Sequence, residues 1–430
     1  MCYNIGIMKA FSTIWFWWRH AGFRRYFFNT GWMFAGQIFS LGTSFLIGIW
    51  MARYLGPFAY GNLNYAIAFT SLFGIFASLG LDNILSRELV NNPQDRDRLL
   101  GTVFRLKLWG SLAVIVTAAI CAYLLESDNL VRLLIVIYSL VFVFNAANVV
   151  YLYFQAQVLS KKNAQVQITV AALSALLKIG LIIGGGNLVS LMLVYVFDAM
   201  FSAVAWLIIY RRQGCSLRAW RYSSALAKSL WHDAWPLMLS GAAMFIYLRI
   251  DQVMIGSLLD HGAVGLYSVS VRFVEVWYFI PGMICASLLP AIINAKKTDI
   301  NQYRRRLRFL YALMLILAFV IAIPSAWLAP WFLPLLFGSA YAGAVPILQI
   351  YIFSSLGFFL GWAINQYLLA ENMVMVIFQA NLSAMIINVA LNFYLIPRFG
   401  LLGAAVATLL AYSLYPLLSW LYARPKLVTN

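Results

Sequence analysis

The chain has 430 residues, of which 63% are hydrophobic and only 10% are charged, whereas about a quarter of the residues of a typical soluble protein are charged. This composition excludes a soluble globular protein, because a chain of this size could not bury so much apolar surface. The net charge of +17 would indicate a nucleic-acid partner for a soluble protein, but here it follows from membrane topology, as the positions of the charges show.

Apolar runs of membrane-spanning length follow one another along the whole chain. A transmembrane helix needs about twenty apolar residues. The runs lie at 30–51, 60–82, 103–125, 130–157, 165–184, 188–210, 235–258, 263–292, 308–330, 343–369, 373–396 and 401–423. We therefore expect an all-α polytopic membrane protein with about twelve transmembrane helices. The preceding segment "FSTIWFWWRHAGFRRYFF" has no cleavage site, which predicts an interfacial arm rather than a signal peptide.

The basic residues alternate between the two sides of the predicted bundle. Twenty-four of the thirty Lys and Arg residues fall in every second connection, and three, Arg53, Arg132 and Arg398, fall in the others. Under the positive-inside rule, this asymmetry places both termini in the cytoplasm. Clusters such as "YRRRLRF" also suit anionic lipid head groups. The pattern argues against nucleic acid as a partner.

The two halves of the chain resemble each other. At a shift of 204 residues, "AYG" at 59–61 falls on "AVG" at 263–265, and at a shift of 209 the segments 157–175 and 366–384 share seven residues. Six spans in each half give both halves the same orientation, related by an axis along the membrane normal. This architecture favours alternating access. The expected parts are a cytoplasmic interfacial arm (1–29), an N-lobe with spans 1–6 (30–210), a cytoplasmic linker (211–234), a C-lobe with spans 7–12 (235–425) and a tail (426–430).

Three blocks carry a family resemblance. "ARYLGPFAYGNLNYAIAF…GLDNILSREL", "LRIDQVMIGSLL…AVGLYSVSVRFVEVWYFIPGMICASLLPAI" and "NQYLLAEN…IINVALNFYLIPRFGLLGAAVAT" resemble the polysaccharide (O-antigen type) flippases of the multidrug/oligosaccharidyl-lipid/polysaccharide exporter superfamily. The resemblance implies translocation of undecaprenyl-pyrophosphate-linked oligosaccharide repeat units from the cytoplasmic to the periplasmic leaflet of the bacterial inner membrane, in the synthesis of lipopolysaccharide O-antigen. It also implies a periplasmic-side polymerase as a partner.

Six ionisable residues lie well inside the predicted spans, where each needs a partner or water. They are Lys178, Asp198, Arg249, Asp251, Arg272 and Glu275. Counted from the turn between spans 7 and 8, the last four lie about 14–21 Å from the periplasmic end, near mid-bilayer. Arg272 and Glu275 share a helix face, so they could pair with each other and with one residue of span 7.

The functional interpretation of these charges competes with a structural one. Arg249 and Arg272 suit a pyrophosphate through their planar guanidinium groups, and Lys178 is a further candidate for substrate binding. Asp251, Glu275 and Asp198 are candidates for H⁺ or Na⁺ coupling. Alternatively, the charges of spans 7 and 8 form a buried network that fixes the hairpin, and the pair in spans 5 and 6 is structural.

Arg87 and Arg53 are candidates at the two mouths of the pathway. Arg87 follows Asp82 at the cytoplasmic end of span 2, and Arg53 precedes the Leu-Gly-Pro turn at the periplasmic end. A pyrophosphate crossing the membrane would meet Arg87 first and Arg53 last. Alternatively, the two arginines only anchor their spans at the head groups, and Arg87 pairs with Asp82.

Cofactor chemistry is not indicated by the sequence. The four cysteines and three histidines lack metal-ligand spacing, and "GGGN" at 184–187 lacks the Lys-Ser/Thr of a phosphate-binding loop. The short, acid-poor loops offer no general acid or base, so we expect a transporter and not an enzyme. The alternative function is a cation-coupled multidrug exporter of the same superfamily.

Overall fold

The computed structural model describes residues 21–371 and 373–428, which form helices and short 3-10 segments with no β-strand in these ranges. The helices are α2 (Ala21–Ser71), α3 (Gly74–Ser78), α4 (Leu81–Asn91), α5 (Arg96–Leu125), α6 (Asn129–Asn145), α7 (Asn148–Ala156), α8 (Ser160–Ile183), α9 (Leu188–Arg212), α10 (Ser224–Leu258), α11 (His261–Glu275), α12 (Phe279–Thr298), α13 (Ile300–Phe337), α14 (Val345–Tyr351), α15 (Ser354–Ala370) and α16 (Val374–Val428). The 3-10 segments are η1 (Pro93–Asp95), η2 (Leu217–Ala219), η3 (Val276–Tyr278) and η4 (Ser339–Ala344). Most of the expected interfacial arm, residues 1–20, lies outside the described residues.

Two of the helices each contain two membrane spans. At about 1.5 Å per residue, α2 and α16 would be more than twice as long as the ~30 Å hydrocarbon core. Each is bent at one glycine with positive φ, Gly56 (φ 70°) in α2 and Gly400 (φ 58°) in α16. Pro57 follows the first bend and begins the next helical segment, as the Leu-Gly-Pro turn predicts. The bends let a single run of helix cross, reverse and cross again.

The number of spans agrees with the sequence. Nine helices in the described ranges are long and apolar enough to cross a membrane, and the bent pair of η4/α14 and α15 makes a tenth. Because α2 and α16 count twice, the bundle has twelve spans. The prediction of an all-α membrane protein with about twelve spans in two lobes is confirmed.

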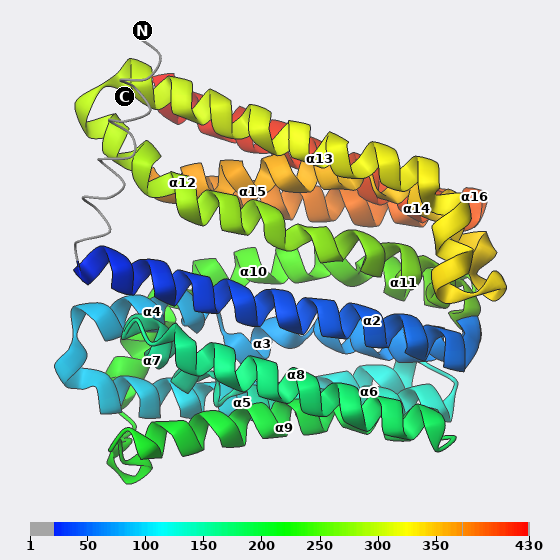
Figure 1. Ribbon diagram of the computed structural model, residues 1–430, viewed down its shortest axis with the longest axis horizontal. Coiled ribbons are helices and arrows are strands. Elements are labelled where there is room, and N and C mark those ends of the chain that lie inside the picture. Colours follow the sequence, from blue (N-terminus) through cyan, green and yellow to red (C-terminus); the bar gives the residue numbers. More distant parts are fainter. Residues whose placement is uncertain (1–20, 372, 429–430) are drawn as a thin grey trace, which may run out of the picture.

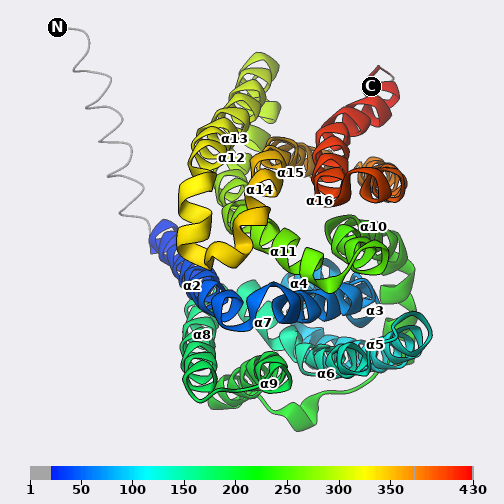
Figure 2. The same ribbon diagram turned by 90° about the vertical axis from the view of Figure 1, so that its right-hand side faces the viewer.

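The helices form two lobes that lie side by side (Figures 1 and 2). Helices α2–α9 make the N-lobe, below in both views, and α10–α16 make the C-lobe, above. The left end of Figure 1 holds the turns at 91–96, 157–160, 298–300 and 371–373, together with the segment 213–223 that joins the lobes. We call this the basic end, because the predicted basic connections lie there. We call the right end, with Gly56 and Gly400, the closed end.

The lobes pack against each other mainly through α2 and α11 at the closed end. There, one hydrophobic core cluster contains residues of both lobes, such as Tyr60 and Leu63 of α2 and Tyr267 of α11. Toward the basic end the buried residues divide into separate clusters. One holds N-lobe helices with the start of α10, and others lie wholly within the C-lobe. The interface between the lobes is therefore continuous at one end only.

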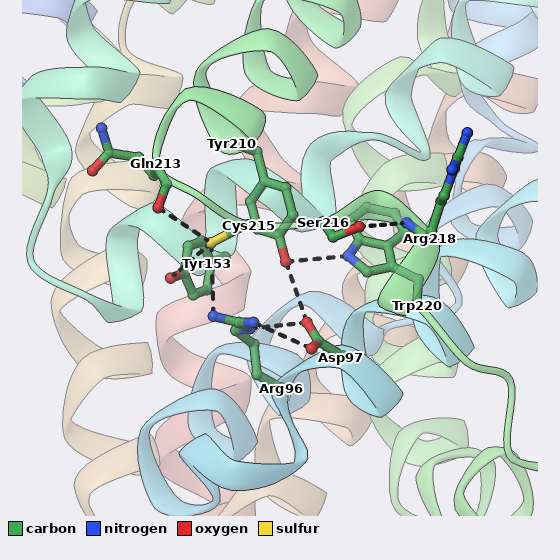
Figure 3. Close-up of polar contacts among 9 residues, drawn as sticks. All are labelled: Arg96, Asp97, Tyr153, Tyr210, Gln213, Cys215, Ser216, Arg218 and Trp220. Atoms are coloured by element: carbon green, nitrogen blue, oxygen red, sulfur yellow. Dashed lines mark hydrogen bonds and ion pairs between the residues drawn. The ribbon is translucent and has the colours of Figure 1, made fainter.

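The segment that joins the lobes is bound to the N-lobe (Figure 3). Trp220 Nε1 donates a hydrogen bond to Tyr210 Oη at 3.2 Å, and Tyr210 Oη donates to Asp97 Oδ1 at 3.4 Å. Asp97 also pairs with Arg96 at 2.9 Å. Because this segment is attached to the N-lobe, the lobes are connected through α10, which begins at Ser224, inside the segment expected to link them.

Candidate functional site

A cavity of about 360 Å³ lies between the lobes at the basic end. The N-lobe lines it with the break between α3 and α4, and the C-lobe lines it with α10, α15 and α16. Its polar lining residues are Asp82, Asn83, Ser240, Asn365, Gln366 and Asn381, and Trp362 supplies an indole ring. The cavity and the closed end together give an arrangement that is open toward the basic side.

The N-lobe wall of this cavity is a broken helix. Span 2 is interrupted between α3 and α4, where Leu79 and Gly80 have φ angles of 53° and 66°. Positive φ is uncommon for a residue with a side chain, and irregular backbone inside a membrane occurs where protein or a water-filled cavity surrounds it. Gly80 and the first turn of α4 line the cavity. The break thus exposes polar groups at the interface between the lobes.

Asp82 in this wall is paired with Lys107 of α5. The Lys107 side chain is only 4% exposed, whereas the Asp82 side chain is 41% exposed and borders the cavity. Lys107 falls near the start of the apolar run 103–125 and lies inside the bundle. The expected pairing of Asp82 with Arg87 does not occur. Arg87 instead contacts Glu88 at 3.1 Å and Asp233 at 3.8 Å.

The closed end depends on two glycines that let backbones meet. A Cβ atom on Gly61 would overlap the carbonyl oxygen of His261, and one on Gly265 would overlap the carbonyl oxygen of Pro57. Only glycine allows this approach. The α2 and α11 backbones are therefore in direct contact across the interface between the lobes.

The side chain of His261 adds a polar contact to this closure. His261 Nδ1 lies 2.6 Å from Asn62 Oδ1, and Nε2 lies 3.6 Å from Glu126 Oε2. The ring also stacks on Tyr65 with centroids 4.7 Å apart. His261 belongs to the C-lobe, and its three partners belong to the N-lobe. Sequence reasoning missed this contact, because lone His and Asn residues carry no spacing signal.

The charged residues of spans 7 and 8 do not form the pair of Arg272 and Glu275 that their shared helix face predicts. Glu275 pairs with Arg249, at 3.1 Å and 3.2 Å, rather than with Arg272. The Arg249 and Glu275 side chains are 29% and 28% exposed. The pair joins α10 and α11 of the C-lobe, at about mid-bilayer depth by residue count from the turn between them.

Arg272 reaches across to the other lobe. Its guanidinium donates hydrogen bonds to the backbone carbonyl and the hydroxyl of Ser44 in α2 and lies against Gly48. Within the described part of the chain, no carboxylate lies within 4.0 Å of it, and its Nε has no hydrogen-bond partner. Arg272 is thus a cation at the interface between the lobes that neutral groups hold in place.

Lys178 and Asp198 form a pair inside the N-lobe. Lys178 Nζ lies 3.3 Å from Asp198 Oδ2, which also accepts a hydrogen bond from Ser174 at 2.7 Å. These residues line a second cavity of about 230 Å³ between α2, α8 and α9. The other oxygen of Asp198 has no partner in the described residues. The pair joins α8 to α9, which is the structural alternative of the sequence analysis.

Asp251 lies inside the C-lobe, 2% exposed. Its carboxylate accepts hydrogen bonds from Tyr267 Oη at 2.6 Å, Thr408 Oγ1 at 3.3 Å and the backbone N–H of Gln252 at 2.8 Å. Within the described residues it makes no ion pair. A buried carboxylate held by neutral donors can take up a small cation or a proton.

Arg53 lies at the closed end, beside the Leu-Gly-Pro turn. Its guanidinium donates a hydrogen bond to the carbonyl of Leu335 in α13 at 2.6 Å. This bond also crosses between the lobes. Arg53 and Arg87 are therefore far apart, at opposite ends of the bundle, and neither lines the cavity at the basic end.

Comparisons with known proteins agree with this architecture. Residues 27–296 match a family described as Polysaccharide biosynthesis protein, which is more than half of the chain. The chain belongs to this family. The capsular polysaccharide biosynthesis protein CapF of Staphylococcus aureus is 23% identical over 416 residues, which cover 92% of this chain and 98% of CapF.

Two solved structures show the same fold. One is an inward-facing multidrug resistance MATE family transporter of the MOP superfamily (TM-score 0.73, 13% identity, 91% of this chain and 95% of that chain). The other is the Lipid II flippase MurJ in an inward closed conformation (TM-score 0.68, 15% identity, 91% of this chain and 87% of that chain). The resemblance to polysaccharide flippases is confirmed. This polysaccharide biosynthesis protein is a multi-pass membrane transporter and not an enzyme.

Proposed function

We propose that this polysaccharide biosynthesis protein carries an undecaprenyl-pyrophosphate-linked oligosaccharide repeat unit from the cytoplasmic to the periplasmic leaflet of a bacterial inner membrane. The basic end faces the cytoplasm, and the structure corresponds to the state that is open to it. Rocking of the lobes would break the α2–α11 contact and open the closed end to the periplasm. The relatives support this proposal, because CapF is a capsular polysaccharide biosynthesis protein and MurJ is a lipid II flippase.

Arg272 is the observation that carries the proposal. A charged side chain near mid-bilayer costs several kcal/mol unless it has a partner, yet within the described residues Arg272 has no carboxylate within 4.0 Å and donates hydrogen bonds to the neutral Ser44. An anionic cargo would supply the missing charge, and the guanidinium fork suits phosphate oxygens. Arg249 lies at a similar depth and would exchange Glu275 for the pyrophosphate. The substrate would thus bind where the lobes meet.

The two arginines nearer the membrane surfaces have lesser roles in this mechanism. Arg87 is 58% exposed at the basic end and would attract the phosphates before they reach the cavity. Arg53 would act after opening, because its bond to Leu335 holds the closed end together. Lys178 is tied to Asp198 inside the N-lobe and would contribute indirectly.

Coupling to H⁺ or Na⁺ would use buried carboxylates. Asp251 is the first candidate, because neutral donors from α11 and α16 surround it and a bound cation would change how these helices pack. Asp198 is the second, through its unpartnered oxygen. Glu275 would act by releasing Arg249 to the substrate. A periplasmic-side polymerase would receive the product.

A cation-coupled multidrug exporter is the alternative function, supported by the likeness to a MATE transporter. Such a site requires an unneutralised acid facing the cavity. Among the described residues, Asp82 is the one carboxylate that lines the cavity at the basic end, and Lys107 neutralises it. The charge arrangement therefore favours an anionic cargo.

Reconstitution separates the two functions. Proteoliposomes would be loaded with a lipid-pyrophosphate-linked oligosaccharide, and a glycosidase added outside would report each glycan that has crossed. The proposal predicts glycan transfer that depends on the protein, with no uptake of organic cations such as ethidium. Ethidium transport driven by an ion gradient, without glycan transfer, would support the exporter instead.

A further inference from the structure

The cavity at the basic end has a chemistry distinct from that of the arginines. Among the described residues that line it there is no Lys, Arg or His, and the one carboxylate among them, Asp82, is neutralised by Lys107 of α5. Four amide side chains, one hydroxyl and one indole ring lie in the rest of the wall, among apolar residues that form most of it. Its volume of about 360 Å³ falls in the range of ligand pockets, about 300–1,000 Å³. The wall can thus bind a polar, uncharged group but lacks a cation for an anion.

The amide side chains of the cavity wall have donors and acceptors that can bind a ligand. Asn365 Oδ1 accepts from Tyr415 Oη, which leaves its NH₂ group. Asn381 Nδ2 donates to Ser240 Oγ at 3.2 Å, which leaves its carbonyl oxygen. Asn83 and Gln366 make no side-chain hydrogen bond in the ranges that the structure describes. The wall therefore offers both donors and acceptors, which suits hydroxyl and acetamido groups that need both.

Depth separates this cavity from the arginines. Ser240 lines the cavity and Arg249 lies nine residues further along the same helix, which corresponds to about 14 Å at ~1.5 Å per residue. If the pyrophosphate binds at Arg249 or Arg272, another part of the same molecule therefore occupies the cavity. In a lipid-linked glycan, that part is a sugar ring beyond the phosphates.

We propose that this cavity, lined by Asn83, Trp362, Asn365, Gln366 and Asn381, is a glycan subsite that binds uncharged or N-acetylated sugar rings and disfavours acidic ones. The inference rests on the proposed function, since the sugar arrives as part of the lipid-linked substrate. Trp362 contributes an apolar ring against which a sugar face can pack. The carboxylate of a uronic acid would lose its bound water in the cavity without gaining a cation as a partner. This cost of desolvation is why the cavity should favour neutral sugar rings over acidic ones.

Binding of matched lipids to the protein in nanodiscs tests this subsite. The probes are three lipid pyrophosphates that carry no sugar, a neutral N-acetylated disaccharide, or the same disaccharide with a uronic acid as its second ring. We expect the neutral disaccharide to bind about tenfold more tightly than either other lipid. Gln366→Ala and Trp362→Ala should each weaken its binding about threefold to tenfold, the range of one or two lost contacts. Neither variant should change binding of the sugar-free lipid.

Controls distinguish failure of the subsite from failure of the proposed function. Gln302→Ala removes an exposed amide at the start of α13, outside the cavity, and should change nothing. Gln366→Arg should reverse the preference and favour the acidic disaccharide, which a variant that fails to fold could not do. Equal binding of all three lipids, with no effect of Gln366→Ala, would overturn the subsite but leave the proposed function intact. If none of the lipids binds, both proposals are wrong.

Discussion

Gly61 packs against the backbone carbonyl of His261, and the 204-residue repeat relates this contact to the one between Gly265 and Pro57. Residue 61 corresponds to 265, and residue 57 corresponds to 261. The closure between the lobes is thus self-complementary, as an interface around a two-fold axis must be. Because both contacts are made by backbone, they hold the lobes in register at the closed end.

Substitution of Gly61 or Gly265 should prevent this closure. Gly61→Leu places a side chain where the His261 carbonyl lies, so we expect the basic end to close instead and transport to fall at least tenfold. Spin labels at Gln94→Cys and Gln302→Cys, on opposite lobes at the basic end, would measure a shorter distance. Gly42→Leu is the control, because its Cβ meets nothing within 4 Å. An unchanged distance in Gly61→Leu would show that the backbone contact does not govern the equilibrium.

The contact of His261 with Asn62 and Glu126 should stabilise the closed end less than the two glycine contacts do. His261→Leu removes both polar contacts, and one net hydrogen bond contributes about 1 kcal/mol, which corresponds to about a fivefold shift toward the state closed at the basic end. His261→Gln can still donate to Asn62 and should shift the equilibrium less. The same spin-label pair measures both variants. If the leucine variant matched the unmodified protein, the contact would be incidental.

Removing Asp82 should lower the free energy of unfolding more than removing its partner Lys107. Asp82→Asn leaves a buried ammonium without its partner and should reduce the free energy of unfolding by about 3 kcal/mol. Lys107→Met leaves a carboxylate that is 41% exposed and should cost about 1 kcal/mol. The double variant should recover most of the loss, since no charge remains. Denaturation in detergent measures the three values, and equal costs for the two single variants would contradict the pairing.

The membrane potential should accelerate export. A pyrophosphate diester carries about two negative charges, and each gains about 2.3 kcal/mol on leaving a cell interior held at −100 mV. Dissipating the potential with valinomycin and K⁺, at fixed H⁺ and Na⁺ gradients, should slow glycan transfer in proteoliposomes. A rate that follows the Na⁺ or H⁺ gradient alone would assign the driving force to Asp251 or Asp198.

The sequence predicts the span count, the repeat and the Gly56 turn, because each is a local or periodic property of the chain. Side-chain partners depend on helix rotation and crossing, which the sequence does not encode locally. Glu275 therefore pairs with Arg249 on the neighbouring helix and not with Arg272 on its own helix. Lys107 reaches Asp82 for the same reason, since only the fold brings α5 against the start of α4. The positive φ of Leu79, in the cavity wall, carries no sequence signal.

Arg272 is the residue on which the account depends most, and export in cells tests it most directly. Arg272→Gln keeps hydrogen-bond donors to Ser44 but removes the charge, whereas Arg272→Lys keeps the charge. After membrane insertion is confirmed, we expect about a tenfold or greater loss of exported repeat units in the glutamine variant and partial activity in the lysine variant. Lipid-linked glycan should remain on the cytoplasmic leaflet. Normal export by Arg272→Gln would show that the mid-membrane cation only fastens the lobes together and does not handle the substrate.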